Sequence, residues 1–435
     1  MDRFTGILGV FALMGIAWLI SNNRKAINWR TVGVGVGLQV LFALLVLKTT
    51  PGQWMFQGAR VLISRLLTFT DYGAHFLFGN LYLSSPEIAE SIADDIPAGG
   101  LVEGFSVTNP ATGDLVSLGT VFAIHVLPTI IFFASLMALL YYLGVMQRIV
   151  QGFAWLMTRA MGTSGSESLS VASNIFVGQT EAPFVVKPFL GRMTFSEIMA
   201  VMTGGFATVA GGVMAAYVRF GIDPGHLMAA SVMSAPAALV MAKLIIPETE
   251  TPETGKSVKI HVEQPYANVI DAAAGGATDG LKLAVNVAAM LVAFIAIIAM
   301  INALLGWAGG LVGIENLSLK IIFGYLFSPL ALLMGVHPKD ILDVGYLLGT
   351  KISINEFVGY VELAGLRGEI SPRSFTIATY ALCGFANFSS IAIQIGGIAA
   401  LVPSRRRDLA RLGLRAMIAG ALASWQTAAI AGILL

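Results

Sequence analysis

The sequence predicts an all-α integral membrane protein with about eight transmembrane helices, two re-entrant helical hairpins, one interfacial helix and an inverted internal repeat. Hydrophobic residues make up 56% of the 435 residues and charged residues only 12%, a composition that lipid solvates better than water does. Two apolar regions resemble each other about 175 positions apart, and each carries a glutamate, Glu181 or Glu356. A carboxylate within a bilayer is costly, so its recurrence in both halves indicates a functional site.

Eight apolar segments come close to the roughly 20 residues that a helix needs to cross a bilayer core. They are residues 4–20, 32–47, 118–146, 195–220, 226–246, 283–305, 375–401 and 416–435. The first is followed by Arg24 and Lys25 and by no small-residue cleavage pattern, so we expect a retained helix and not a secretion signal. A run of small residues at 271–280 precedes the sixth segment and would allow close helix contact.

Three other segments are not expected to cross the membrane. Residues 54–78 mix Arg60 and Arg65 with Trp, Phe and Leu, which is typical of a helix lying in the interface plane. Residues 84–114 and 248–264 are polar and are expected to form aqueous loops. The net charge of +1 gives no basis for nucleic-acid binding, because the basic residues stand in short clusters between apolar runs.

Two further regions, 148–189 and 317–363, are apolar but are interrupted near the middle by Gly, Ser, Thr and the glutamate. Each suits two half-helices that meet at a polar tip, an arrangement tolerated only where protein buries it or water fills a cavity beside it. Paired broken helices in corresponding places of two repeats are typical of the binding site of a secondary transporter. We therefore expect a re-entrant hairpin in each half.

The expected organisation has four parts. Residues 1–146 form scaffold helices and the interfacial helix, and residues 248–316 form a cytoplasmic loop and a central scaffold helix. Residues 147–247 and 317–435 each hold one hairpin and one repeat half, and together they form a transport unit. Basic residues in short loops set the orientation. Arg24, Lys25 and Arg30 mark a cytoplasmic end, and with eight crossings the cluster 405–407 is cytoplasmic too, so both termini are external.

The polar side chains at the hairpin tips indicate what can bind there. The first tip offers an amide, a hydroxyl and a carboxylate on consecutive residues, and the second region offers a carboxylate, an amide and hydroxyls without a balancing array of Arg. Such a set favours a substrate with vicinal hydroxyls and a ring edge that both donates and accepts hydrogen bonds. An aromatic side chain, Phe385, could face a planar ring. The polar residues are Gln179, Thr180, Glu181, Glu356, Asn387, Ser389 and Ser390.

These residues also allow a structural role and two other functional classes. Lys187 and Lys351 lie near the two glutamates in sequence, so each glutamate could instead be half of a buried structural ion pair. An intramembrane hydrolase would need closely paired aspartates, a positioned nucleophile or a metal, and the sequence supplies none of these patterns. A channel would need a continuous polar lining, whereas the polar residues gather at two tips. A transporter, and not an enzyme, is expected.

Three segments carry a resemblance to a known family. They are Gly178-Gln179-Thr180-Glu181, the run from Lys351 to Phe357 (KISINEF) and the run from Cys383 to Ile391 (CGFANFSSI). With them the chain resembles the concentrative nucleoside transporters over almost its whole length. The resemblance implies a bacterial inner-membrane homotrimer in which each protomer imports a nucleoside by alternating access, driven by an ion gradient, with no organic cofactor.

The resemblance also implies roles for individual residues. Gln179, Thr180 and Glu181 would meet the nucleobase, with Val213 packing nearby, Phe385 contacting the base and Leu283 adding an apolar contact. Glu356, Asn387 and Ser390 would meet the ribose hydroxyls. The coupling sodium ion would lie between the first hairpin tip and the unwound part of the next helix, at Asn174, Val177, Thr208 and Val209. The alternative is a proton-coupled nucleoside symporter in which Glu181 or Glu356 carries the proton.

Overall fold

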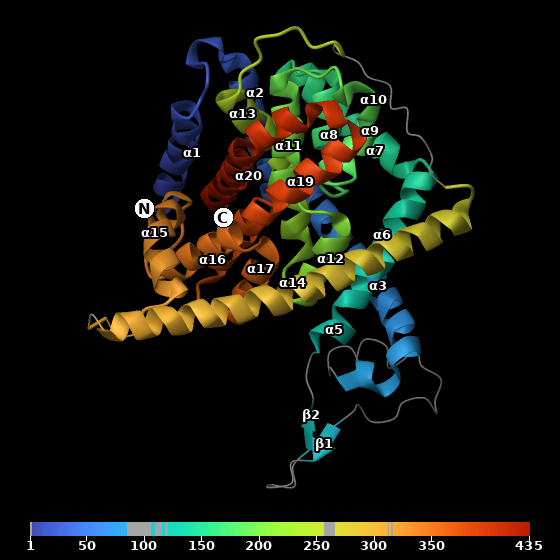
Figure 1. The fold of residues 1–435 in the computed structure, drawn as a ribbon, viewed down its shortest axis with the longest axis vertical. Helices are drawn as coiled ribbons and strands as arrows, with labels where there is room; N and C mark the ends of the chain where they lie inside the picture. The colour runs from blue at the N-terminus through green and yellow to red at the C-terminus, as the bar shows by residue number, and fades with distance from the viewer. Residues whose placement is uncertain are drawn as a thin grey trace.

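The structure, a computed structural model, describes residues 2–84, 106–108, 115–117, 121–255, 266–311, 313–314 and 316–435. Within these residues the chain is built almost entirely of helices (Figure 1). The two strands of the described part, β1 (Ser106–Thr108) and β2 (Leu115–Ser117), pair antiparallel as a small ribbon. The loops expected at 84–114 and 248–264 fall largely outside the described residues.

The N-terminal part begins with two apolar helices and a long third one. Asn28 caps the second by accepting from the backbone N–H of Arg30 at 3.1 Å, and Thr49 caps the third by accepting from Gly52 N–H at 3.1 Å. The third helix is the segment predicted to be interfacial, and its place in an interface plane stays a prediction. The elements are α1 (Asp2–Leu19), η1 (Arg24–Ala26), α2 (Trp29–Lys48), α3 (Thr50–Phe78), η2 (Gly79–Ser84), α5 (Phe122–His125) and α6 (Leu127–Tyr142).

The first hairpin is shorter than the predicted region because a separate helix, α7 (Val145–Met161), precedes it. Gly144 and Gly162 bound α7 with φ of 77° and 73°, a left-handed conformation that glycine adopts without strain. The hairpin itself consists of α8 (Gly165–Asn174), α9 (Ala182–Val185) and α10 (Lys187–Leu190). After it, the predicted span 195–220 is split into α11 (Phe195–Ala207) and α12 (Gly211–Arg219), and α13 (Pro224–Ile245) follows.

The second half repeats this order of elements. A separate helix again precedes the hairpin, and the predicted span 375–401 is again split in two. The elements are α15 (Leu319–Leu333), α16 (Ile341–Ser353), α17 (Glu356–Gly365), α18 (Pro372–Leu382), α19 (Phe388–Leu401), η3 (Pro403–Arg405) and α20 (Arg406–Leu434). In Figure 1 the first hairpin lies in the upper part of the molecule and α16 and α17 lie in the lower part, as an inverted repeat requires.

Between the halves runs α14 (Val269–Leu311), a single helix of 43 residues. At 1.5 Å per residue it is about 64 Å long, roughly twice the thickness of a bilayer core. The sequence predicts a span only over 283–305, but the preceding small residues continue the helix. A Cβ added at Gly276 would lie 2.6 Å from Ala138 Cβ, and one at Gly280 would lie 2.8 Å from Ala134 Cβ. The expected close helix contact is therefore confirmed, with α6 as the partner.

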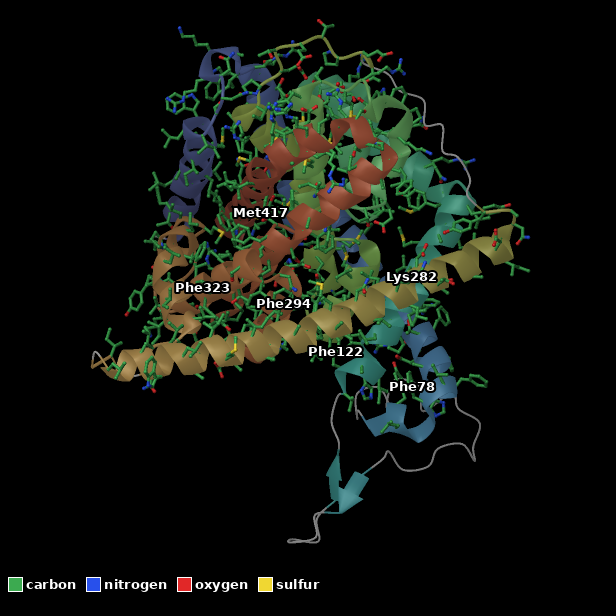
Figure 2. The ribbon with its side chains drawn as sticks, viewed as in Figure 1. Phe78, Phe122, Lys282, Phe294, Phe323 and Met417 are labelled. Atoms are coloured by element: carbon green, nitrogen blue, oxygen red, sulfur yellow. The ribbon has the colours of Figure 1, made fainter. Side chains whose placement is uncertain are left out.

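The membrane character is clear in the described residues, where six helices are long and apolar enough to cross a bilayer and three shorter helices are also apolar. Burial separates them into two kinds. The apolar windows of α11–α12, α13 and α20 are 83–89% buried, whereas that of α14 is 11% buried. Figure 2 shows Met417 of α20 among the packed helices, and Lys282 and Phe294 along α14, of which Phe294 packs against the core. The broken helix α11–α12, α13 and α20 therefore form the packed centre, and α14 lies outside it.

Buried charges fasten the base of the first hairpin. Lys243 of α13 lies 2.7 Å from a Glu167 oxygen of α8 and 3.3 Å from Glu248, and it donates to Ser196 Oγ at 3.0 Å. Glu197 of α11 accepts from Ser164 Oγ at 2.5 Å, just before α8. Because α8, α11 and α13 meet in this network, the hairpin arm has a fixed position relative to the broken helix beside it.

Replacing Lys243 with Met is expected to lower the free energy of unfolding by about 3–5 kcal/mol, because buried carboxylates lose their cation. The midpoint of thermal unfolding of the purified protein measures this loss. Lys282→Met is the control: Lys282 pairs with Asp279 at 3.0 Å, but both side chains are about two-thirds exposed, so its loss should stay below about 1 kcal/mol. Equal shifts for the two variants would contradict the expectation.

Candidate functional site

The two breaks in the helices lie directly against each other. α11 ends at Ala207 and the chain resumes as α12 at Gly211, while α18 ends at Leu382 and α19 begins at Phe388. Gly384, inside the second break, has φ of 120°, and a Cβ there would lie 2.6 Å from the Phe206 carbonyl oxygen. Only glycine fits this backbone conformation and this approach. Unwound backbone from both repeats is therefore buried at one place.

The first hairpin tip reaches across to the second broken helix. Gln179, only 8% exposed, donates from Nε2 to Ser390 Oγ at 3.2 Å and accepts at Oε1 from Gln394 Nε2 at 3.1 Å. Gln394 Nε2 also lies 3.1 Å from the Met202 carbonyl oxygen of α11. Thr180 is half-buried and Glu181 is exposed. The amide of the first tip is thus held between α11 and α19.

The second hairpin tip carries a buried carboxylate. Glu356 is 4% exposed and is the first residue of α17, where the helix dipole favours negative charge. Its oxygens accept from Asn387 Nδ2 at 3.0 Å and from Tyr217 Oη at 3.3 Å. Asn387 Oδ1 in turn accepts from the Ser390 backbone N–H at 2.9 Å. Hydrogen bonds therefore run without interruption from Glu356 through Asn387 and Ser390 to Gln179.

Two members of this network were not predicted from the sequence. Tyr217 donates to Glu356, and Gln394, only 1% exposed, joins Gln179 to α11. Each lies four positions after a predicted residue, Val213 or Ser390, and so shares its helix face. That spacing was the available signal.

The other predicted substrate residues lie at different distances from this network. Val213 of α12 is 3% exposed, on the same helix as Tyr217, and Phe385 is half-buried in the second break. Leu283 stands apart, since it is 36% exposed on α14, a helix that packs mainly against α6. Ser389 donates to Asn387 Oδ1 at 2.7 Å and so supports the network.

The predicted sodium ligands lie at the end of α8 and in the first break. Asn174 is 1% exposed; its Nδ2 donates to the Ser170 carbonyl oxygen at 3.1 Å, and its Oδ1 is buried without a hydrogen-bond donor. Thr208 Oγ1 donates to Gly204 O at 3.0 Å and keeps its lone pairs. Val177 and Val209 lie outside the helices, so no helical hydrogen bond engages their carbonyl oxygens. This oxygen-rich set fits a hard cation.

The structure excludes one alternative for Glu356, a buried ion pair with Lys351. Lys351 is not the ion-pair partner of Glu356, because its ammonium donates to the carbonyl oxygens of Ala381 and Cys383 and to Ser424 Oγ, at 2.7–3.3 Å. Glu356 is satisfied by Tyr217 and Asn387 instead. The carboxylate at the second tip is therefore held by neutral donors that another ligand could displace.

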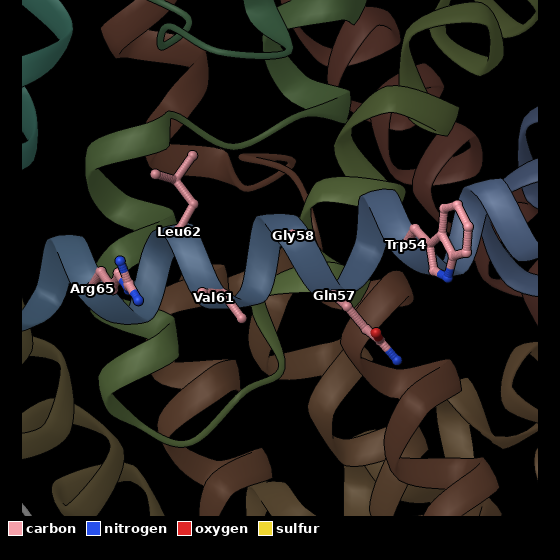
Figure 3. A pocket seen from close by; sticks show the side chains of 6 residues that line it. All are labelled: Trp54, Gln57, Gly58, Val61, Leu62 and Arg65. Atoms are coloured by element: carbon pink, nitrogen blue, oxygen red, sulfur yellow. The ribbon is translucent and has the colours of Figure 1, made fainter.

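A surface hollow of about 480 Å³ lies elsewhere, along α3 (Figure 3). One helix supplies all of its lining side chains, and none of the predicted site residues is among them. They are Trp54, Gln57, Gly58, Val61, Leu62 and Arg65. The hollow is thus an open feature of this helix face, and the candidate site is the polar network between the hairpins.

Broken helices that bury a polar site inside an apolar protein, in corresponding places of two repeats, are typical of secondary transporters. Comparison with known proteins identifies the family. The family described as Na+ dependent nucleoside transporter matches residues 8–81 with its N-terminal part and 226–432 with its C-terminal part, and a nucleoside recognition family named Gate matches 123–224. The chain belongs to this family, the concentrative nucleoside transporters, whose members are transporters and not enzymes.

Individual relatives are similar over the full chain. Sodium/nucleoside cotransporter 1 of Mus musculus is 41% identical over 449 residues, covering 100% of this chain and 64% of the mouse protein. The solved structure of CNTnw in an inward-facing substrate-bound state has 43% identity and a TM-score of 0.87, covering 100% of this chain and 98% of CNTnw. A CNTnw variant in an outward-facing state has 43% identity and a TM-score of 0.88, with the same coverage of both chains.

Replacing Gln394 with Leu is expected to raise the KM for a transported nucleoside by about tenfold, because Gln179 Oε1 and the Met202 carbonyl would lose their donor and the first tip its position. Initial rates of uptake into proteoliposomes measure the KM. Gln151→Leu, the same change at an exposed position of α7, should leave the KM unchanged. An unaltered KM in the Gln394 variant would show that the tip is held by other contacts.

Proposed function

We propose that this protein is a sodium-coupled symporter that imports nucleosides across the bacterial inner membrane by alternating access. The observation that carries the proposal is the buried network from Glu356 to Gln179, which joins both hairpin tips where both helix breaks meet. Membership of a nucleoside transporter family and likeness to CNTnw in opposite-facing states support it.

The chemistry of the network suits a nucleoside. A carboxylate accepts from two vicinal hydroxyls, so Glu356 with Asn387 and Ser390 would bind the ribose. The nucleobase would pair with Gln179, Thr180 and Glu181, with an aromatic face from Phe385 and apolar contact from Val213 and, less directly, Leu283. The substrate would displace the Tyr217 and Asn387 donors or share the carboxylate with them. Anionic substrates are disfavoured, because the proposed set of substrate residues contains two glutamates and no arginine.

The coupling ion would bind at Asn174, Val177, Thr208 and Val209. The unpartnered Oδ1 of Asn174 supports this placement, since a buried acceptor without a donor is costly unless a cation or water meets it. Gly211 N–H donates to the Phe176 carbonyl at 3.0 Å and ties the hairpin next to Val177 to the break. Sodium bound here would order the first tip and so complete the nucleoside site.

A proton-coupled symporter is the second candidate. One observation favours it: Glu356 is 4% exposed and, in the described part of the chain, lies within 4.0 Å of no Lys, Arg or His nitrogen. A desolvated carboxylate of this kind can carry a proton across a membrane. The sodium site is preferred because its orphaned oxygen has no role in a proton mechanism.

Movement would take place between two parts of the chain. Residues 147–247 and 317–435 would carry the substrate against a scaffold formed by residues 1–146 and 248–316, with both termini external. The apolar outer face of α14, which exposes Val285, Val292 and Met300, would meet lipid or further protomers of a homotrimer. Ion pairs of Arg60 with Asp223 and of Arg219 with Asp71 link the two parts in this structure.

Uptake of labelled uridine into proteoliposomes tests the function itself. An inward sodium gradient is expected to drive accumulation above equilibrium, and an inward proton gradient in sodium-free buffer is not. Accumulation with protons alone would move the coupling role to a glutamate. No uptake under either gradient would refute the nucleoside assignment.

Replacing Asn174 with Ala tests the ion site. The sodium concentration for half-maximal uptake is expected to rise by about tenfold or more, because a side-chain ligand and its orientation are lost. Asn23→Ala, at an exposed position whose side chain makes no capping hydrogen bond, is the control and should behave as the unmodified protein. If the Asn174 variant keeps both its sodium dependence and its nucleoside affinity, the ion binds elsewhere.

A further inference from the structure

Lys351 has a fully buried ammonium group that no step of the proposed transport cycle uses. The residue lies in α16, the first arm of the second hairpin, and is 0% exposed. Its three N–H groups meet three acceptors: the Ala381 carbonyl at 2.8 Å, the Cys383 carbonyl at 3.3 Å and Ser424 Oγ at 2.7 Å. The group is therefore completely satisfied without a carboxylate.

The three acceptors show which elements the Lys351 ammonium group connects. Ala381 and Cys383 stand at the C-terminal end of α18, where the chain unwinds before α19, and Ser424 belongs to α20. The last carbonyls of a helix have no partner within it, and they form the negative end of its dipole. Lys351 therefore neutralises the end of a half-helix that is buried away from water, and it ties the hairpin arm to α18 and α20.

The first repeat has a different group beside its break. There α11 ends at Ala207, and Asn174 of the first hairpin arm lies against Gly204 of α11, where an added Cβ would be 3.4 Å from its Nδ2, while its Oδ1 is buried without a donor. The first hairpin arm thus carries an unpaired acceptor, Asn174 Oδ1, which a cation could meet. The second arm carries a cation itself, the ammonium group of Lys351. The two breaks touch at Gly384 and Phe206, so each cation would stabilise one side of the same site.

We propose that Lys351 is a positioning residue of the nucleoside site, a fixed internal cation that holds the second break as the proposed coupling ion would hold the first. It holds the segment Cys383–Asn387 so that Asn387 donates to Glu356 and accepts from the backbone N–H of Ser390. The identity of the substrate groups rests on the proposed function. The role of Lys351 rests on its own three contacts.

Packing alone does not account for this residue. Moving an ammonium out of water costs several kcal/mol, and an apolar side chain of similar volume commonly stabilises a buried contact as well or better. Directional hydrogen bonds to the Ala381 and Cys383 carbonyls fix the backbone at the start of the break, which an apolar side chain cannot do. Lys351 is therefore expected to fix the position of the Asn387 side chain, four residues beyond Cys383.

Lys351→Met tests the proposal, because methionine keeps most of the volume and removes the charge. The KM for uridine is expected to rise by about tenfold or more, since small displacements of a binding constellation are costly. The sodium concentration for half-maximal uptake should change by less than about twofold, because the first break keeps its contacts. The preference for uridine over 3′-deoxyuridine should fall towards one as Asn387 and Ser390 lose their alignment with Glu356.

Lys320→Met is the matched control. Lys320 lies on the adjacent helix α15, is 56% exposed and pairs with Asp343 at 2.9 Å, so its loss should alter none of the three values. Unchanged uridine KM and unchanged ribose preference in the Lys351 variant would overturn the proposal. A parallel fall of uridine affinity, sodium affinity and melting temperature would also overturn it, because that pattern belongs to a purely structural residue.

Ser424→Ala keeps the proposal testable if the Lys351 variant does not fold. It removes one acceptor and leaves the charge, so the uridine KM should rise by about threefold at an unchanged sodium dependence, while the melting temperature falls modestly because one ammonium N–H loses its partner. An unchanged KM would contradict the role of the ammonium. If the unmodified protein fails to discriminate against 3′-deoxyuridine, the ribose placement in the proposed function is wrong. In that case a loss of uridine affinity in the Lys351 variant, without a loss in the Lys320 variant, would still support the positioning role.

Discussion

The contact between the two helix breaks is the constraint on which the rest of the structure depends. Backbone that leaves a helix inside an apolar protein must find hydrogen-bond partners within the protein. Here each break is closed by the other and by a hairpin: Gly384 packs on the Phe206 carbonyl, and Gly211 donates to Phe176. The inverted repeat brings both breaks to one place, and the side chains of Gln179, Glu356 and Asn387 gather beside them; in the proposed function these side chains bind the substrate.

Sequence reasoning found this centre because polar residues are rare in such a chain. Gln179, Glu181, Glu356 and Asn387 stand out in apolar surroundings, and the glycines beside them mark where helices can end. Their recurrence predicted hairpins in both halves. The prediction missed Tyr217 and Gln394, which lie within regular helices and not beside a break. Nothing in the sequence around them indicates their hydrogen-bond partners, Glu356 and Gln179, because only the tertiary structure brings these residues together.

The boundaries of the helices were harder to predict for a physical reason. Glycine ends α7 at Gly162, where φ is positive, but it continues α14 at Gly276 and Gly280, where a neighbouring helix approaches too closely for any side chain. The same residue type thus ends one helix and continues another, because the packing of a neighbouring helix determines which conformation the glycine adopts. Length alone likewise could not show that α14 extends far beyond the expected span.

The network that joins the hairpin tips is made of neutral amide and hydroxyl groups around a single carboxylate, and this choice has a consequence for speed. Exchanging one such hydrogen bond for one to water or to a solute changes the free energy by only about 0.5–1.5 kcal/mol. An ion pair at the same place would resist separation far more strongly. In the proposed cycle, the junction of Gln179 with Ser390 and Gln394 would therefore close fully and still separate at a low cost in free energy.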